Sequence, residues 1–306
     1  MSLKSCMAFK SATLAGITID RLHTLCAVVE AGTIVSAAGP DPNRQSLFSR
    51  QIKDLEKAIG TPLFDRVGKT LQLNENGRRV VLAAHTFFGS LDDVMNAVVA
   101  AAETVTLGAN EAVLRWLIMP HLGELMSGDP PIRFEVRSFP SEAALREVRS
   151  GRLDLAIIRT EVITDDLESE LIAPLQHVFA LPRTFLRTKE AAEVFEGRPI
   201  PFAELGGDPF HAKAVRSIAT SLGLNLRPII QVESFSLLMS AVESGTAAAF
   251  IPDVAARLLP EQRFAQVAAE PMKELQRSLS LVWYGTSVES RASVRRAVTR
   301  LKRALA

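Results

Sequence analysis

Polar and cationic side chains gather at the start of a helix that the sequence predicts over residues 44–59. Two prolines, Pro40 and Pro42, stop the preceding helix, and the new helix begins directly after them. Glutamine can pair with adenine, arginine with guanine, and lysine or serine with backbone phosphates. Such a surface is suited to the groove of a DNA duplex. The residues that would carry this chemistry are Arg44, Gln45, Ser46, Ser49, Arg50 and Lys53.

The elements around this helix predict a helix-turn-helix. Thr18 is placed to cap a first helix that ends near Gly32, and Gly39 ends a short second helix over residues 34–38. Asp41 or Asn43 caps the third helix. The third helix has an apolar face that anchors it, so its polar start can enter a major groove. The alternative is an ordinary amphipathic helix with a solvated charged face. The apolar face consists of Phe48, Ile52, Leu55 and Ile59.

Two short predicted strands follow the third helix and form a wing. They read LFDRV and TLQLN and flank a tight turn at Gly68 and Lys69. Arg66 on the first strand and Lys69 at the tip are predicted to reach backbone phosphates. The whole chain carries a formal net charge of only +1, so this local concentration of cations matters more than the total.

A long helix is predicted from residue 75 to residue 103. Its apolar side chains alternate in steps of four and three, which is a heptad-like seam. A lone helix would leave this seam in water, so we expect it to pack on a second copy of the chain and form a homodimer or homotetramer. The alternative is that it docks on the C-terminal domain of its own chain. The seam consists of Val80, Ala84, Phe87, Leu91, Val94 and Val98.

From residue 105 onward, apolar strands alternate with helices, which predicts a two-lobed α/β domain with a parallel sheet covered on both faces. Ligands bind such sheets at the carboxyl ends of the strands, where helix N-termini point. Free N–H groups there favour a small anionic effector, and Arg159 strengthens that expectation. The alternatives are that the polar residues only cap helices and that Arg159 pairs with an acid. The predicted effector-binding residues are Asn110, Glu111, Ser138, Arg159, Thr160, Ser234 and Phe250.

Features of other protein classes are scarce. The two cysteines form no CxxC pair, the five histidines are scattered, and no GxSxG, HExxH or Walker loop occurs. We therefore expect no catalytic residues, no metal and no cofactor. No apolar run reaches the ~18 residues that cross a bilayer, and no secretory signal begins the chain, so we expect a cytoplasmic protein without a membrane partner. A two-lobed solute-binding protein or an enzyme without a DNA-binding role is the alternative.

The stretch AGTIVSAAGPDPNRQSLFSRQIKDLEKAIGTPLFDRVGKTLQLNENGRRV resembles, without a gap, the N-terminal winged helix-turn-helix of the LysR-type transcriptional regulators. The segments SGRLDLAII, SLLMSAVESGTAAAFIP and LSLVWYG are similar to the effector domain of that family. The resemblance implies a homo-oligomer on an interrupted palindrome and an inducer in the cleft of a domain like the type 2 periplasmic binding proteins. RNA polymerase is a further candidate partner. The family commonly has a proline where Ser46 stands and a longer second helix.

These observations predict an α/β protein overall, with an all-α winged helix-turn-helix at its N-terminus and a two-lobed Rossmann-like effector domain. The expected boundaries are an extension over residues 1–16, the DNA-binding domain over 17–76, the linker helix over 77–104 and the effector domain over 105–306. Lobe I is expected to contain residues 105–178 and 283–306, and lobe II residues 179–282.

Overall fold

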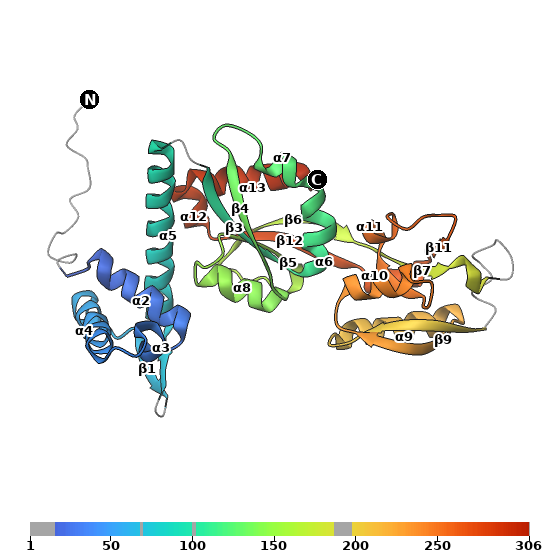
Figure 1. Cartoon of the computed structure of the whole chain (residues 1–306), viewed down its shortest axis with the longest axis horizontal. Helices are drawn as coiled ribbons and strands as arrows, with labels where there is room; N and C mark the ends of the chain where they lie inside the picture. The colour runs from blue at the N-terminus through green and yellow to red at the C-terminus, as the bar shows by residue number, and fades with distance from the viewer. Residues whose placement is uncertain (1–15, 68–69, 100–101, 187–197, 306) are drawn as a thin grey trace.

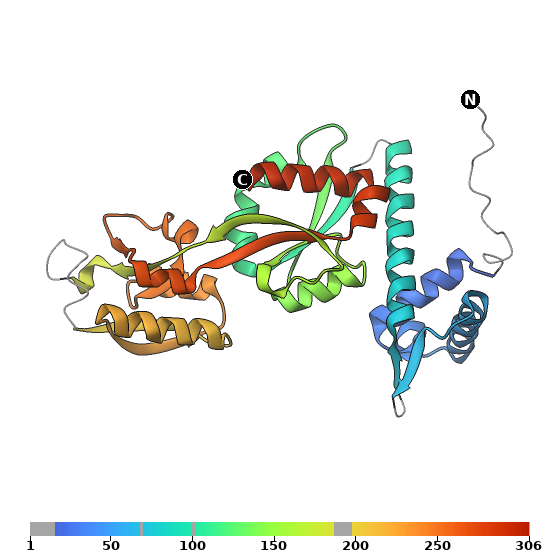
Figure 2. The ribbon, with the colours of Figure 1, turned by 180° about the vertical axis from the view of Figure 1, so that it is seen from behind.

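The structure is a computed structural model that describes residues 16–67, 70–99, 102–186 and 198–305. The molecule is elongated and has three parts in a row: an N-terminal helical domain, the long helix α5 and a two-lobed α/β region (Figure 1). Seen from behind, two strands run between the lobes (Figure 2). The predicted fold class is confirmed. The predicted N-terminal extension, apart from its last residue Gly16, lies outside the described residues.

The N-terminal domain is the predicted helix-turn-helix with a wing. Thr18 caps its first helix, and the Asp41 carboxylate accepts a hydrogen bond from the Asn43 N–H at 2.9 Å. The third helix begins at Pro42, two residues before the predicted start, because proline fits the first turn of a helix, where its missing N–H is not needed. The elements are α2 (Ile19–Ala31), α3 (Ile34–Ala38), α4 (Pro42–Ile59), β1 (Phe64–Val67) and β2 (Thr70–Leu73).

Helix α5 (Glu75–Val98) is built into this domain at its N-terminal end. Val81 joins the domain core, in which Leu25 of α2 and Leu55 of α4 are fully buried. The sequence predicted that this helix would continue to residue 103, but it ends at Val98. Glu103 instead begins a strand that pairs with a distant one, in register with Ile132. This long-range pairing overrides the local helical pattern.

Lobe I is a five-stranded sheet in the order β4-β3-β5-β12-β6. The predicted parallel arrangement holds for β4, β3 and β5, whereas β12 runs antiparallel to both of its neighbours. Helices α7 (Leu122–Met126) and α13 cover one face and α8 the other (Figure 1). The strands are β3 (Glu103–Ala109), β4 (Ile132–Ser138), β5 (Leu155–Arg159), β6 (Glu168–Leu175) and β12 (Arg277–Trp283), and the helices are α8 (Ser141–Arg149), α12 (Gly285–Ser290) and α13 (Ala292–Ala304).

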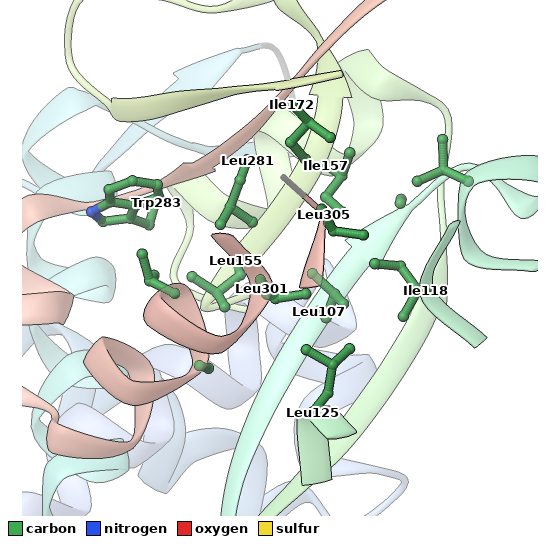
Figure 3. Close-up of a cluster of buried hydrophobic side chains, with 14 of the residues drawn as sticks. Leu107, Ile118, Leu125, Leu155, Ile157, Ile172, Leu281, Trp283, Leu301 and Leu305 are labelled. Atoms are coloured by element: carbon green, nitrogen blue, oxygen red, sulfur yellow. The ribbon is translucent and has the colours of Figure 1, made fainter. Parts of the chain in front are cut away.

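The predicted return of the chain to lobe I at residue 283 was wrong. All of β12 belongs to the lobe I sheet, so the crossing lies near residue 276. An apolar strand looks alike in either lobe, and only its pairing partners decide where it belongs. The side chains of β12 also build the core of lobe I, where Leu281 and Trp283 lie with Leu107, Leu155 and Leu301 (Figure 3).

The helical segment after β3 is broken into α6 (Glu111–Val113), a π-helical turn (Leu114–Ile118), a 3₁₀ turn (Met119–His121) and α7 (Leu122–Met126). Pro120 explains the break, because its ring clashes with the preceding turn and it has no N–H to donate. The broken segment serves both lobes. Ile118 packs in the lobe I core, and Trp116 packs in a core cluster of lobe II.

Lobe II has two small sheets. Strands β10, β7 and β11 form an antiparallel sheet, and β8 pairs with β9 in parallel. The strands are β7 (His177–Pro182), β8 (Pro199–Leu205), β9 (Asn225–Val232), β10 (Ala249–Pro252) and β11 (Phe264–Val267), and the helices are α9 (Pro209–Leu222), α10 (Phe235–Glu243) and α11 (Asp253–Ala256).

A buried ion cluster fastens α5 to lobe I. The guanidinium of Arg291, between α12 and α13, is 8% exposed and bonds Asp93 of α5 at 3.1 Å, the Thr104 carbonyl at 2.9 Å and the Asp154 carboxylate. Burial raises the pKa of the Asp154 carboxyl, and the charge of Arg291 opposes that shift. A Cβ added at Gly89 would lie 2.7 Å from the guanidinium, so glycine permits the close approach. We call Asp93, Asp154 and Arg291 the clamp.

Two buried histidines lie in lobe II behind the ring of Phe235. The His177 and His211 ring centroids are 6.4 Å apart and lie 5.5 and 5.6 Å from that of Phe235. Burial lowers the pKa of His177 to about 3 and that of His211 to about 4. Neither ring nitrogen of His177 has a hydrogen-bond partner among the described residues. Both rings are therefore neutral in the folded protein near neutral pH.

Replacing Arg291 by methionine is expected to lower the free energy of unfolding by about 3–5 kcal/mol, because it leaves Asp93 and Asp154 buried without their cation. Urea unfolding followed by the fluorescence of the buried Trp116 and Trp283 measures the change. The control is Arg295→Met on the exposed side of α13, which should change stability by less than about 0.5 kcal/mol. Equal urea midpoints for the Arg291 variant and the unmodified chain would contradict the role of the clamp.

The histidine pair is expected to make stability fall as the pH drops below about 6.5. In that range the unfolded chain takes up protons on these rings and the folded chain does not. Protonation therefore lowers the free energy of the unfolded state relative to the folded state until the pH reaches the folded pKa values of about 3 and 4. His177→Phe should make the melting temperature fall less steeply between about pH 6.5 and 4.5. His23→Gln, at an exposed position, is the control. An unchanged slope in His177→Phe would refute the assignment.

Candidate nucleic-acid interface and effector cleft

The polar start of α4 forms a shallow open hollow on the surface of the N-terminal domain. Five of the six residues that the sequence predicted on this helix line it together. Ser46, Arg50 and Lys53 are exposed, and Gln45 and Ser49 are half-buried. The hollow is lined by Pro42, Gln45, Ser46, Ser49, Arg50, Lys53 and Asp54.

Local contacts set the direction of the groups around the hollow. The Gln45 side-chain amide donates to the Gly39 carbonyl at 2.7 Å, which ties α4 to the turn before it and leaves a second N–H and a carbonyl oxygen for a base edge. Arg44, the sixth predicted residue, is exposed and holds its guanidinium 5.3 Å from the Phe48 ring centroid. The acid at the rim, Asp54, is paired with Arg21 at 2.9 Å. Its charge therefore does not oppose a phosphate.

The wing stands beside this helix. Strands β1 and β2 pair antiparallel, with Phe64 opposite Leu73 and Val67 opposite Thr70. Arg66 belongs to β1, and the predicted tip residue Lys69 lies outside the described residues. The two predicted strands of the wing are therefore present.

A row of exposed apolar side chains runs along the outer half of α5. These side chains are between 42% and 76% exposed, which is unusual for a row of large apolar groups on one helix face. Phe87, Leu91, Val94 and Val98 lie at steps of four and three, and Met95 lies four residues after Leu91, so all five share one face. We call Phe87, Leu91, Val94, Met95 and Val98 the α5 stripe.

Two residues of the predicted seam do not belong to this stripe. Ala84 is only 2% exposed, and Val80 packs against the core of the N-terminal domain. Both continue the same face, but α2 and its neighbours in the same chain cover that part of α5. The opposite side of the helix carries Gly89 and Asp93 at the clamp, so the alternative that α5 docks on its own C-terminal domain holds for that side.

A cleft of about 850 Å³ opens where the lobes meet. Five predicted effector-binding residues line it: Asn110, Glu111, Ser138, Arg159 and Ser234. The sequence did not single out several others, although the Asp-Pro pair before α9 was a helix-start signal that could have found Asp208. The additional lining residues include Phe139, Glu142, Asp208, Phe210, Glu233 and Phe235.

Two predicted effector-binding residues lie elsewhere. Phe250 is fully buried in the lobe II core, where its ring centroid is 4.9 Å from that of Phe179. All four residues of β10 are buried, so this strand has no face toward the cleft. Thr160 also does not line the cleft, and its hydroxyl is bonded to that of Ser280 at 2.9 Å.

Most polar groups in the cleft already have partners. Asn110 caps the turn after β3 through the Val113 N–H at 2.9 Å, and Ser234 caps α10 through the Leu237 N–H at 3.3 Å. Arg159 contacts the Glu142 carboxylate and lies 3.7 Å from that of Glu161. Both alternatives considered from the sequence therefore hold in the structure: Asn110 and Ser234 cap helical segments, and Arg159 is paired with acids.

Contacts also bridge the two lobes at the cleft. The Ser236 hydroxyl of α10 donates to the Glu111 carboxylate, and the Arg115 guanidinium donates to the same hydroxyl at 3.2 Å. Within the described residues, no group of three or more His, Cys, Asp or Glu side chains is arranged to hold a metal ion. Among the helices that the structure describes, none combines the length and apolar character that a membrane span requires.

Comparison with known proteins agrees with this division of the chain. A family model described as a bacterial regulatory helix-turn-helix protein of the lysR family matches residues 19–78, and the LysR substrate binding domain matches residues 100–306. A probable RuBisCO transcriptional regulator of Synechocystis sp. is 24% identical over 290 residues, which cover 90% of this chain and 83% of the relative.

Two solved structures share the fold over nearly the whole length. ArgP from Mycobacterium tuberculosis has a TM-score of 0.67 at 19% identity, with 94% of this chain and 96% of that chain covered. Full-length CbnR in complex with its target DNA has a TM-score of 0.54 at 18% identity, with 94% and 99% covered. Since both family models match adjoining parts of the sequence, the chain belongs to the LysR family of transcriptional regulators, which are not enzymes.

Proposed function

We propose that this regulator binds double-stranded DNA as a homodimer through α4 and the wing, and that a small molecule in the interlobe cleft controls it. The observation that carries the proposal is the hollow on α4, where exposed Arg50 and Lys53 stand beside Gln45 and Ser46 at the start of a helix. The fold is shared with CbnR, whose structure was solved with its target DNA. That likeness supports the proposal for this chain.

Each group in the hollow has a chemical role in the proposal. Gln45 and Arg50 contact base edges in the major groove, because an amide and a guanidinium each make paired hydrogen bonds there. Ser46, Ser49 and Lys53 hold phosphates, and Arg44, Arg66 and Lys69 add backbone contacts from the flanks. The paired state of Asp54 keeps the surface free of an opposing charge.

The α5 stripe supports a dimer. Two copies packed stripe to stripe would bury its side chains and set two α4 helices at a fixed separation. Each copy then contacts one half-site of an interrupted palindrome. A pair of such dimers, a homotetramer, is the next larger assembly that this arrangement permits, and RNA polymerase is a further proposed partner.

The cleft is suited to control because its walls come from both lobes. Ser138 and Arg159 end strands β4 and β5 of lobe I and Glu111 follows β3, whereas Asp208 and Ser234 come from lobe II. A ligand that contacts both walls favours one relative placement of the lobes. The clamp connects lobe I directly to α5, so a change in the lobes can reach the dimer.

Arg50→Ala is expected to weaken binding to the operator by about 1–3 kcal/mol and to relax its sequence preference, because a base contact is lost. Lys57→Ala, at an exposed position in the last turn of α4, is the matched control and should lose much less. The operator is first identified by mapping bound DNA across the genome, and affinity is then measured by gel-shift titration at several salt concentrations. Unchanged operator affinity in Arg50→Ala would remove α4 from the proposal.

Leu91→Glu is expected to shift the protein from dimer to monomer, because it places a charge in the middle of the α5 stripe. Asn96→Glu is the control on the opposite side of the helix, where the residue borders a different hollow. Sedimentation velocity measures the assembly, and circular dichroism checks that both variants fold. A Leu91→Glu protein that remains a dimer would exclude the stripe as the dimer interface.

A further inference from the structure

We propose that the effector of this regulator carries a net positive charge and has the chemistry of an amine or guanidinium on a short apolar stem. The inference rests on the proposed function, which makes the interlobe cleft the effector site. It reverses the anionic effector that the sequence favoured. Two observations support it: the charged groups that line the cleft, and the acidic residues at the helix N-termini around it.

The cleft wall is acidic. Four carboxylates line it, and the only lining guanidinium among the described residues is that of Arg159. Arg159 contacts Glu142 and also lies 3.7 Å from Glu161, so its charge is already shared by two acids. An anionic ligand would have to displace these acids and would face the remaining ones. The lining carboxylates are Glu111, Glu142, Asp208 and Glu233.

Acidic residues of the chain itself lie at the helix N-termini around the cleft. Asp208 caps α9 by accepting a hydrogen bond from the His211 N–H at 3.0 Å. Glu233 immediately precedes Ser234, which caps α10, and Glu142 stands in the first turn of α8. A helix N-terminus attracts an anion, and a nearby carboxylate of the chain satisfies that attraction. The reason for expecting an anionic guest is therefore removed at each of these helices.

Cations near the cleft do not reverse this balance. Arg115 donates to the Ser236 hydroxyl at 3.2 Å, and the Arg277 guanidinium lies 3.5 Å from the centroid of the Phe210 ring. Both are engaged by neighbours from the described part of the chain. Even when both are counted with Arg159, the four lining carboxylates outnumber the guanidinium groups.

Glu111 shows what a cation would contribute. One of its carboxylate oxygens accepts from Ser236 across the interlobe contact, and the other is inaccessible to water and has no hydrogen-bond partner among the described residues. A positive charge in the cleft attracts this carboxylate without requiring a direct bond.

The acids are divided between the two walls, which suggests how the ligand acts. Glu111 and Glu142 belong to the lobe I side, and Asp208 and Glu233 to the lobe II side. Like charges on facing walls repel more strongly as the cleft narrows. A cation between them removes this repulsion and favours a closer placement of the lobes.

The remaining lining suits the stem of such a molecule. Phe139, Phe210 and Phe235 are among the residues that line the cleft, and the Arg277 guanidinium lies 3.5 Å from the centroid of the Phe210 ring. That contact shows that an aromatic ring beside the cleft accepts a guanidinium, and aromatic faces also cover methylene groups. A basic amino acid, an agmatine-like compound or a diamine combines these two properties.

Isothermal titration of the full chain tests the charge of the ligand. The cationic probes are L-arginine, L-lysine, agmatine and putrescine, and the anionic probes are L-glutamate, succinate and citrate, all at an ionic strength matched with sodium chloride. We expect at least one cationic probe to bind and no anionic probe to do so. Binding of an anionic probe, or binding of none of the cationic probes, would overturn the proposal.

Variants connect the binding to the cleft. Glu233→Gln and Asp208→Asn remove charge with little change of shape, and asparagine remains a good helix cap. Each should weaken the cationic probe roughly tenfold or more, as expected for the loss of one charged hydrogen-bond partner. Glu243→Gln, an exposed acid at the far end of α10, should leave the affinity unchanged. Wild-type affinity in both cleft variants would contradict the proposal.

DNA binding separates this inference from the proposed function. The same gel-shift titration is repeated with and without the probe that binds. If a cationic probe binds in the cleft but leaves operator binding unchanged, the inference on charge is supported, and the role of the cleft as a control site is refuted. If succinate or citrate alters operator binding while the amines do not, the cleft is supported as a control site, and the inference on charge is refuted.

Discussion

The arrangement of this molecule depends on one buried guanidinium. Arg291 holds Asp93 of α5 and Asp154 of lobe I together, and the Ser293 hydroxyl adds a bond of 2.5 Å to Asp93. Two carboxylates in a poorly solvated place are tolerable only because this cation lies between them. Apolar packing could join α5 to lobe I in several neighbouring positions, whereas directed bonds to three partners permit one. The clamp therefore fixes the angle at which the DNA-binding end meets the effector domain.

This constraint gives one helix three separate tasks. Val81 and Ala84 close the core of the N-terminal domain, Gly89 and Asp93 meet the clamp, and the α5 stripe faces outward. Because residues three and four apart share a face, the core contact and the stripe form one continuous line, with the clamp on the other side. A helix that is held at both its N-terminal half and its back can carry a partner on its front without bending. In the proposed dimer, the geometry of the interface and the geometry of the lobes are thus mechanically joined.

Local chemistry made much of the fold predictable, and long-range pairing set the limit. Thr18, Asp41 and Gly60 mark the helix ends of the N-terminal domain because caps and left-handed glycines act within a few residues. The membership of β12 in lobe I, the coverage of Ala84 by its own chain and the burial of Phe250 depend on partners far along the sequence. The same applies to the cleft, where Arg159 was visible as a cation but its pairing with Glu142 and Glu161 was not.

The course of the chain suggests how a change in the cleft reaches α5. Strand β12 enters lobe I from lobe II and crosses the sheet to Trp283, and α12 then leads directly to Arg291 (Figure 2). A displacement of lobe II pulls on this strand and on β6 beside it, which are the two connections between the lobes. Since β12 is paired on both edges and its inner residues are buried, it transmits displacement as a unit instead of stretching locally. The helix α12 that follows this strand leads to the residue that holds α5, so the clamp lies where movement of the lobes would act on the proposed dimer and, through it, on the spacing of its two DNA-binding helices.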